Sequence, residues 1–178
     1  MADKNGDLIL RHTPGERVSH WIVAVVFVFL FLSGLALFHP FFFWLSFLFG
    51  GGQFMRWLHP LAGVLLAVLF YQYASWVWAD NKWLPADSEW RKHMVEYMRL
   101  EVHSPEGTGK YNAGQKLMFW SMVPLIAVLF LTGIVLWQPW FAPYFPAWLR
   151  RVAAILHAIS AFVMFVGIGV HVYAAYWT

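Results

Sequence analysis

The 178-residue sequence contains no cysteine and few charged side chains. Without cysteine, the chain itself cannot form a disulfide, ligate an iron–sulfur cluster or use a thiol nucleophile. Asp, Glu, Lys and Arg make up 12% of the residues, about half of the share in soluble domains. Hydrophobic residues make up 61%. This composition excludes an ordinary soluble domain and indicates a membrane protein, for which we expect no nucleic-acid partner.

Acidic residues and arginine are absent from the middle of four long apolar runs. Each run is long enough to cross about 30 Å of hydrocarbon as a helix, the form in which backbone groups satisfy one another in lipid. The runs cover residues 19–38, 57–78, 116–138 and 149–177. The sequence therefore predicts an all-α membrane protein, a single domain over residues 1–178 with four transmembrane helices in one bundle.

The connections between these runs differ in character. Residues 39–56 are expected to form an aromatic, glycine-rich loop. Residues 79–115 form the only long polar connection, in which residues 88–102 could make a short interfacial helix. No internal repeat is evident. No cleavable signal is evident either, so the first run is expected to be a retained span.

Lysine and arginine are distributed unequally between the two sides of the predicted bundle. Nine precede the first span or lie at 79–116: Lys4, Arg11, Arg17, Lys82, Arg91, Lys92, Arg99, Lys110 and Lys116. Three lie on the opposite side: Arg56, Arg150 and Arg151. The positive-inside rule therefore predicts cytoplasmic N- and C-termini and a cytoplasmic 79–115 loop.

The eight histidines fall into two groups. Four lie in polar or interfacial segments, where an ordinary solvated side chain is expected: His12, His39, His93 and His103. The other four lie within the apolar runs: His20, His59, His157 and His171. Ionisable groups inside a span are costly and are functional candidates by default.

The last run, with LHAISAFVMFVGIGVHV at 156–172, holds two of these histidines fourteen positions apart. Fourteen residues turn a helix by about 1400°, close to four full turns, and advance it by about 21 Å. His157 and His171 therefore share one face but cannot bind one metal ion. By depth, His59 matches His157 on the outer side and His20 matches His171 on the inner side. The sequence thus predicts two bis-histidine sites, the ligand set of low-spin haem b in a helical bundle.

Two further features allow more than one interpretation. The glycines of the spans either let helices pack closely or leave room for a flat macrocycle: Gly34, Gly63, Gly133, Gly167 and Gly169. In GKYNAGQK (109–116), Asn112 and Gln115 have the spacing of a helix capping box, and they could alternatively bind a ligand carbonyl. Lys110 and Lys116 would be nearby cations or membrane-edge anchors.

The sequence resembles the cytochrome b556 (gamma) subunit of respiratory formate dehydrogenase over essentially its whole length. The most specific segments are GKYNAGQKLMFWS (109–121), LTGIVLWQPWFAPYFP (131–146) and the histidine contexts RVSHW, LHPLAG, LHAISA and GVHVYAAYW. The resemblance implies that His20 and His171 are axial ligands of an inner haem b, and His59 and His157 of an outer one. It also implies a quinone site at Asn112, Gly114 and Gln115, in the vicinity of His171. Family members usually continue past the fourth span with a basic tail, whereas this sequence stops at Thr178.

The resemblance further implies a role in anaerobic respiration, and it implies that the membrane is a bacterial cytoplasmic (inner) membrane. A molybdenum- or tungsten-containing catalytic (alpha) subunit would oxidise formate, and an iron–sulfur (beta) subunit would pass the electrons to the outer haem. This chain, which would not oxidise formate itself, would carry them to the inner haem and then to menaquinone or ubiquinone. A higher oligomer of that heterotrimer is a possible assembly.

Other functions fit parts of the pattern. A di-haem cytochrome b of another respiratory complex, such as a hydrogenase or a thiosulfate-type reductase, would carry the same histidine pairs. An intramembrane histidine metal transporter is disfavoured because transporters place their ligands near the midplane, often with carboxylates. A structural anchor without a cofactor would leave four histidines inside the spans unexplained.

Overall fold

The computed structural model describes residues 12–98 and 107–177, and within these ranges every regular element is helical. Four helices are long and apolar enough to cross a membrane: α1 (Pro14–Phe38), α2 (Gly52–Val77), α5 (Ala113–Leu136) and α6 (Ala147–Trp177). Five shorter helices connect them: η1 (Pro40–Phe49), η2 (Ala79–Asn81), α3 (Pro85–Lys92), α4 (Met94–Met98) and η3 (Ala142–Tyr144). The predicted all-α, four-span architecture is confirmed.

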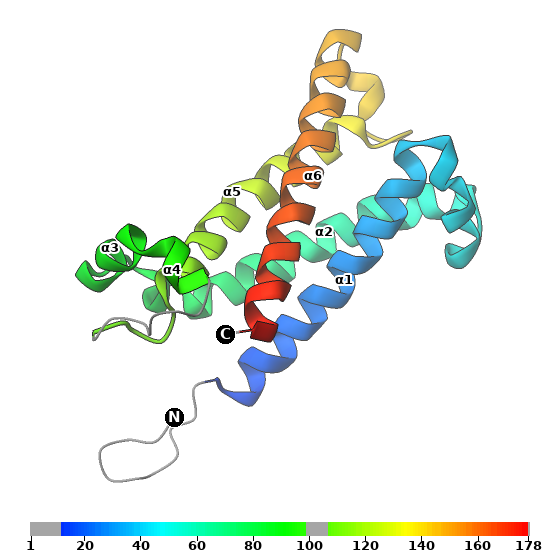
Figure 1. The fold of residues 1–178 in the computed structure, drawn as a ribbon. Coiled ribbons are helices and arrows are strands. Elements are labelled where there is room, and N and C mark those ends of the chain that lie inside the picture. Colours follow the sequence, from blue (N-terminus) through cyan, green and yellow to red (C-terminus); the bar gives the residue numbers. More distant parts are fainter. Residues whose placement is uncertain (1–11, 99–106, 178) are drawn as a thin grey trace.

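The four long helices form two antiparallel hairpins, α1 with α2 and α5 with α6 (Figure 1). The hairpins lie closest where α1 begins and α6 ends, and they diverge toward the α1–α2 and α5–α6 connections. We name the first of these the terminal end, where α3 and α4 also lie, and the second the hairpin end. Contacts between α2 and α5 join the two hairpins.

All four long helices begin before the apolar runs that predict them. For α1 and α5 the cause is a cap in polar sequence, at Thr13 and Asn112. Thr13 caps α1, and Glu16 accepts a hydrogen bond from the Thr13 backbone N–H in return. Helix α2 begins at Gly52 rather than at residue 57. His59 therefore lies well inside α2, and Pro60 is an interior proline of this helix.

Two connections differ from the predictions. Residues 40–49 form the 3-10 helix η1 instead of a loop, and Leu45 and Ser46 of η1 are buried. Leu45 packs with Ala36 of α1 and Met55 of α2, so the aromatic connection folds back onto its own hairpin. The expected interfacial helix at 88–102 is instead two short helices, α3 and α4, separated at His93. Residues 99–102, together with Lys4, Arg11 and His103, lie outside the described residues.

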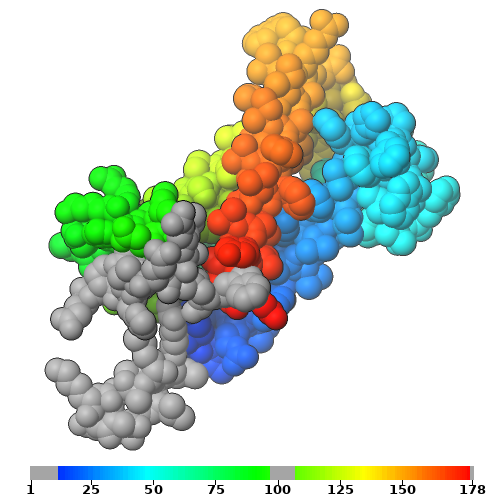
Figure 2. Space-filling model, viewed as in Figure 1, coloured from blue at the N-terminus to red at the C-terminus, as the bar shows by residue number. Residues whose placement is uncertain are grey.

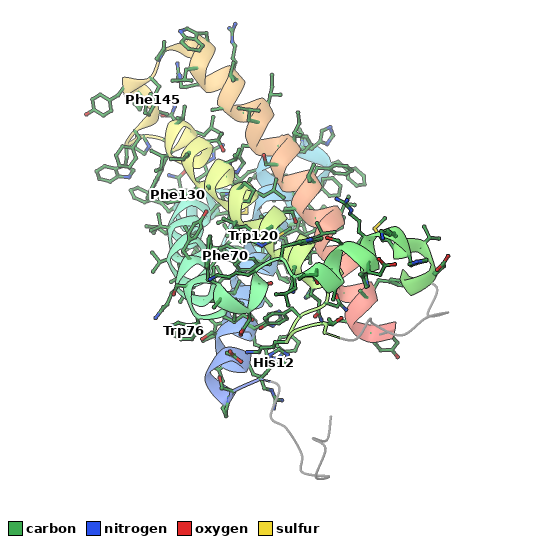
Figure 3. The ribbon with its side chains drawn as sticks, turned by 90° about the vertical axis from the view of Figure 1, so that its left-hand side faces the viewer. His12, Phe70, Trp76, Trp120, Phe130 and Phe145 are labelled. Carbon is green, nitrogen blue, oxygen red and sulfur yellow. The ribbon has the colours of Figure 1, made fainter. Side chains whose placement is uncertain are left out.

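The core is a narrow apolar seam between α2, α5 and α6. Its buried members are Ala67, Phe70, Ala74, Val77, Tyr111, Phe119, Met122, Ile126 and Met164. Figure 3 labels two residues of this seam, Phe70 of α2 and Phe130 of α5. Most large apolar side chains face outward instead, and Figure 2 shows one side of α6 uncovered along its length. Such a surface suits hydrocarbon rather than water.

A buried ion pair attaches α3 to the start of α5. The Lys116 ammonium donates to Asp87 Oδ2 at 2.7 Å, and these two side chains are 0% and 1% exposed. The same oxygen accepts the backbone N–H of Leu84 at 2.6 Å. Lys116 is therefore not a membrane-edge anchor. Its charge is neutralised within the protein, where an unpaired charge would be costly.

Replacing Asp87 with Asn should destabilise the fold by about 3 to 5 kcal/mol, because the buried Lys116 ammonium loses its counter-charge. The shift in thermal unfolding of the purified chain, in one detergent, measures this effect. Glu89→Gln is the control on the same helix, since Glu89 pairs with Lys92 in an exposed position. Equal unfolding midpoints for Asp87→Asn and Glu89→Gln would contradict the prediction.

Candidate functional site

The first predicted histidine pair lies at the hairpin end. The rings of His59 on α2 and His157 on α6 have centroids 6.4 Å apart and planes inclined by 63°. Both side chains are half-buried. Helix α2 therefore brings His59 to the depth of His157, as the sequence predicts.

The second pair lies at the terminal end and joins α1 to α6. The ring centroids of His20 and His171 are 6.1 Å apart, with planes inclined by 50°. Tyr73 of α2 lies edge-on to His20, with a centroid distance of 6.2 Å. His20 is exposed on its helix and His171 is half-buried. Helix α6 thus contributes one imidazole to each pair.

The separation within each pair matches two imidazoles on opposite sides of one metal ion. A metal–imidazole bond is about 2 Å long, so the two nitrogens would be about 4 Å apart and the ring centres roughly 6 Å apart. Within residues 12–98 and 107–177, no third His, Cys, Asp or Glu joins either pair to make a closed metal site. Two axial ligands without further protein ligands are what haem iron requires, because the porphyrin supplies the other four.

Glycines keep the space beside the hairpin-end imidazoles clear. A Cβ atom on Gly34 would lie 3.3 Å from His59 Cε1, and one on Gly133 would lie 3.6 Å from His157 Cε1. Gly63 and Gly169 have no atom within 4 Å of such a Cβ. Gly167 instead approaches methionines of α5, so it serves helix packing.

The hydroxyls of Ser33 and Thr132, each next to one of these glycines, contact the same imidazoles, and neither residue is among the predicted site residues. Ser33 Oγ lies 2.8 Å from His59 Nδ1, and Thr132 Oγ1 lies 2.9 Å from His157 Nδ1. A signal was present in the sequence, because LSGLALF at 32–38 and LTGIVLW at 131–137 share one pattern. The number of residues between Ser33 and His59 is nearly the same as the number between Thr132 and His157. The match is a short shared motif of Leu, a hydroxyl residue and Gly rather than an internal repeat.

The NAGQ segment forms the cap of α5 at the terminal end. Asn112 Oδ1 accepts the Gln115 N–H at 2.9 Å, and Gln115 Oε1 accepts the Asn112 N–H at 3.1 Å. The capping-box interpretation is confirmed. A Cβ on Gly114 would lie 3.2 Å from the ring of Trp90, so α3 lies against this cap. Gln115 remains exposed at this cap.

The second lysine near this cap is also paired. Lys110 donates to Glu16 Oε1 at 2.7 Å and lies 3.3 Å from Asp80 Oδ2, which joins the starts of α1 and α5 to the end of α2. Partial burial lowers the pKa of Lys110, but these carboxylates outweigh it and hold the pKa above its ordinary value. Lys110 is therefore a structural cation of the terminal end.

The histidines outside the two pairs have other surroundings. His39 Nδ1 accepts the Phe41 N–H at 3.2 Å and so caps η1. His93 is exposed and lies 2.8 Å from Glu96. His12 is not simply solvated, since its ring lies 5.8 Å from that of Tyr111. Within the described part of the chain, none of these three belongs to a cluster of three or more residues that could hold a metal ion.

Comparison with known proteins gives a consistent result. The chain matches the prokaryotic cytochrome b561 family over residues 11–178. It is 37% identical to the formate dehydrogenase cytochrome b556 subunit of Haemophilus influenzae, covering 97% of this chain and 73% of that protein. It is 36% identical to the nitrate-inducible formate dehydrogenase cytochrome b556(Fdn) subunit of Escherichia coli K12, with coverage of 96% and 78%. It is 37% identical to the formate dehydrogenase cytochrome b556(fdo) subunit of the same strain, covering 98% of this chain and 82% of that protein.

Proposed function

The chain belongs to the prokaryotic cytochrome b561 family, and we propose that it is the membrane subunit of a formate dehydrogenase, carrying electrons across the membrane on two b haems to a quinone. The observation that carries this proposal is the pair of facing imidazoles at each end of α6. Membership of the family implies haem b. The number of haems and the quinone are part of the proposal.

Each imidazole pair fits the axial positions of one haem. His59 and His157 would hold the group at the hairpin end, and His20 and His171 would hold the group at the terminal end. Haem supplies reversible one-electron chemistry when bound. The protein fixes the depth of each site by the fourteen-residue spacing along α6, which separates the two pairs by about 21 Å. Gly34 and Gly133 leave the imidazole edges uncovered at the hairpin end.

The quinone site belongs at the terminal end. Asn112, Gly114 and Gln115 lie at the start of α5, where backbone N–H groups and a positive helix end favour a carbonyl oxygen or a developing anion. They share this end with His20 and His171, because α1 and α5 begin where α6 ends. The excess of Lys and Arg at this end supports a cytoplasmic location for it, in a bacterial inner membrane. Protons for quinol formation would then come from the cytoplasm.

The donor belongs at the opposite end. The names of the relatives support an assembly with the other subunits of a formate dehydrogenase, and we propose an iron–sulfur subunit as electron donor and a molybdenum- or tungsten-containing subunit as the site of formate oxidation. The donor would meet this chain near His59 and His157. A hydrogenase or thiosulfate-type complex remains the second candidate, and the subunits that copurify with the chain distinguish the two.

Replacing His59 with Leu should reduce the haem content from two to one per chain, because one axial nitrogen of the hairpin-end pair is lost. Haem is quantified in the purified complex from the dithionite-reduced minus oxidised spectrum. His39→Leu is the matched control, since His39 lies at the same end but caps η1. Two bis-imidazole haems in His59→Leu, or none in the wild-type complex, would refute the ligand assignment.

Replacing Gly34 with Leu should have the same effect without touching a ligand. Already the Cβ would lie 3.3 Å from His59 Cε1, so a larger side chain must displace the ring. We expect loss of the hairpin-end haem only, measured by haem content. Gly15→Leu is the control on α1, since a Cβ there meets no atom within 4 Å. Retention of both haems in Gly34→Leu would show that the ring can move aside.

Replacing Gln115 with Ala should slow quinone reduction roughly three- to tenfold, the effect of losing one hydrogen bond, while haem content stays unchanged. Gln115→Glu separates the two roles, because glutamate keeps the capping-box acceptor but lacks the amide donor. Steady-state reduction of a water-soluble quinone analogue by the complex measures the rate. Slowing in both variants supports a ligand contact. An unchanged rate in both would mean that Gln115 is only a helix cap.

A further inference from the structure

The two hydroxyls at the hairpin end are placed alike on different hairpins. Ser33 on α1 contacts His59 on α2, and Thr132 on α5 contacts His157 on α6. Each hydroxyl is followed directly by the glycine that approaches the same imidazole. Ser33 is 0% exposed and Thr132 is 8% exposed. Two independent helix pairs thus present the same polar contact at the same depth.

The direction of these hydrogen bonds follows from the second contact of each hydroxyl. Ser33 Oγ lies 3.2 Å from the Leu30 carbonyl oxygen, and Thr132 Oγ1 lies 2.6 Å from that of Val128. A carbonyl oxygen can only accept, so each hydroxyl donates its proton to its own helix. Its oxygen is then the acceptor for the imidazole. Nδ1 therefore carries the ring proton, and the lone pair stays on Nε2.

We propose that Ser33 and Thr132 are positioning residues for the hairpin-end haem, which hold both axial imidazoles in the Nε2-binding tautomer and lower the midpoint potential of that haem. This proposal rests on the haem ligation proposed above. A hydrogen bond from Nδ1–H makes an imidazole a stronger electron donor to its metal, which favours the oxidised ion. Hydroxyls on both axial ligands add their effects.

The terminal-end pair lacks this arrangement. Within the described residues, neither His20 nor His171 makes a hydrogen bond to another side chain or to the backbone, and their contacts are ring contacts with each other and with Tyr73 and Trp21. The hydroxyls therefore act on one haem only. They make the hairpin-end site the poorer electron acceptor of the two and so favour transfer toward the terminal end, where the quinone is proposed.

The test is a potentiometric titration of the whole complex carrying Ser33→Ala, Thr132→Val, or both. Thr132→Val keeps the side-chain shape and removes only the hydroxyl. We expect two haems per chain and an upward shift in the midpoint potential of one haem, larger in the double variant, with the other haem unchanged. Ser75→Ala and Ser121→Ala are the controls, because those hydroxyls bond only carbonyls of their own helices. These two control variants should leave the midpoint potentials of both haems unchanged.

The outcomes separate this proposal from the proposed function. Absence of haem from the wild-type complex would reject the ligand assignment itself. Two haems with wild-type potentials in the double variant would overturn the role of the hydroxyls and leave the ligands standing. If the Ser33→Ala variant loses the hairpin-end haem, the Ser33→Thr variant shows whether a hydroxyl at this position restores haem binding. If Ser33→Thr binds the haem, the hydroxyl positions the imidazole as proposed. If it does not, the loss in Ser33→Ala is an effect of packing and the proposal is overturned.

Discussion

An imidazole inside a membrane must find a partner for each of its two nitrogens, because hydrocarbon offers no water to hydrogen-bond them. The contacts of the hairpin-end imidazoles follow from this constraint. At the hairpin end, Nδ1 of His59 and of His157 contacts a hydroxyl from a neighbouring helix, and the two rings lie edge-on with centroids 6.4 Å apart. Nε2 of each ring makes no hydrogen bond within the described residues, and Gly34 and Gly133 approach the two rings. Under the proposed function, these two nitrogens would hold one haem.

Helix α6 connects the two histidine pairs. It alone supplies an imidazole to each pair, and it draws its partners from α1 at one end and α2 at the other. The terminal end is further held by charge pairs that α6 does not join. Lys116 with Asp87 secures α3 on α5, and Lys110 joins α1 to the segment before α5. These charge pairs therefore lie at the end where the quinone is proposed.

Much of this could be predicted from the sequence, since composition and apolar runs determine what can cross a membrane. The four spans and the two histidine pairs follow from hydropathy and from helical geometry along one segment. The first residue of α1 could not be predicted from hydropathy, because its cap, Thr13, lies in polar sequence outside the apolar run. The buried position of Lys116 did not follow either, because its counter-charge lies 29 residues away on α3. Ser33 and Thr132 were missed because a hydroxyl in an apolar run usually bonds only its own helix.

The Leu, hydroxyl, Gly motif shared by α1 and α5 explains why the histidine pairs at the two ends of α6 have different surroundings. Both hairpins carry the same Leu, hydroxyl, Gly sequence near the end of their first helix, so both hydroxyls reach the same depth and both act on the hairpin-end imidazoles. His20 has no equivalent, because it lies near the start of α1, more than three helical turns before Ser33. The two histidine pairs therefore have different surroundings: hydroxyls contact both imidazoles at the hairpin end, and ring contacts surround the pair at the terminal end.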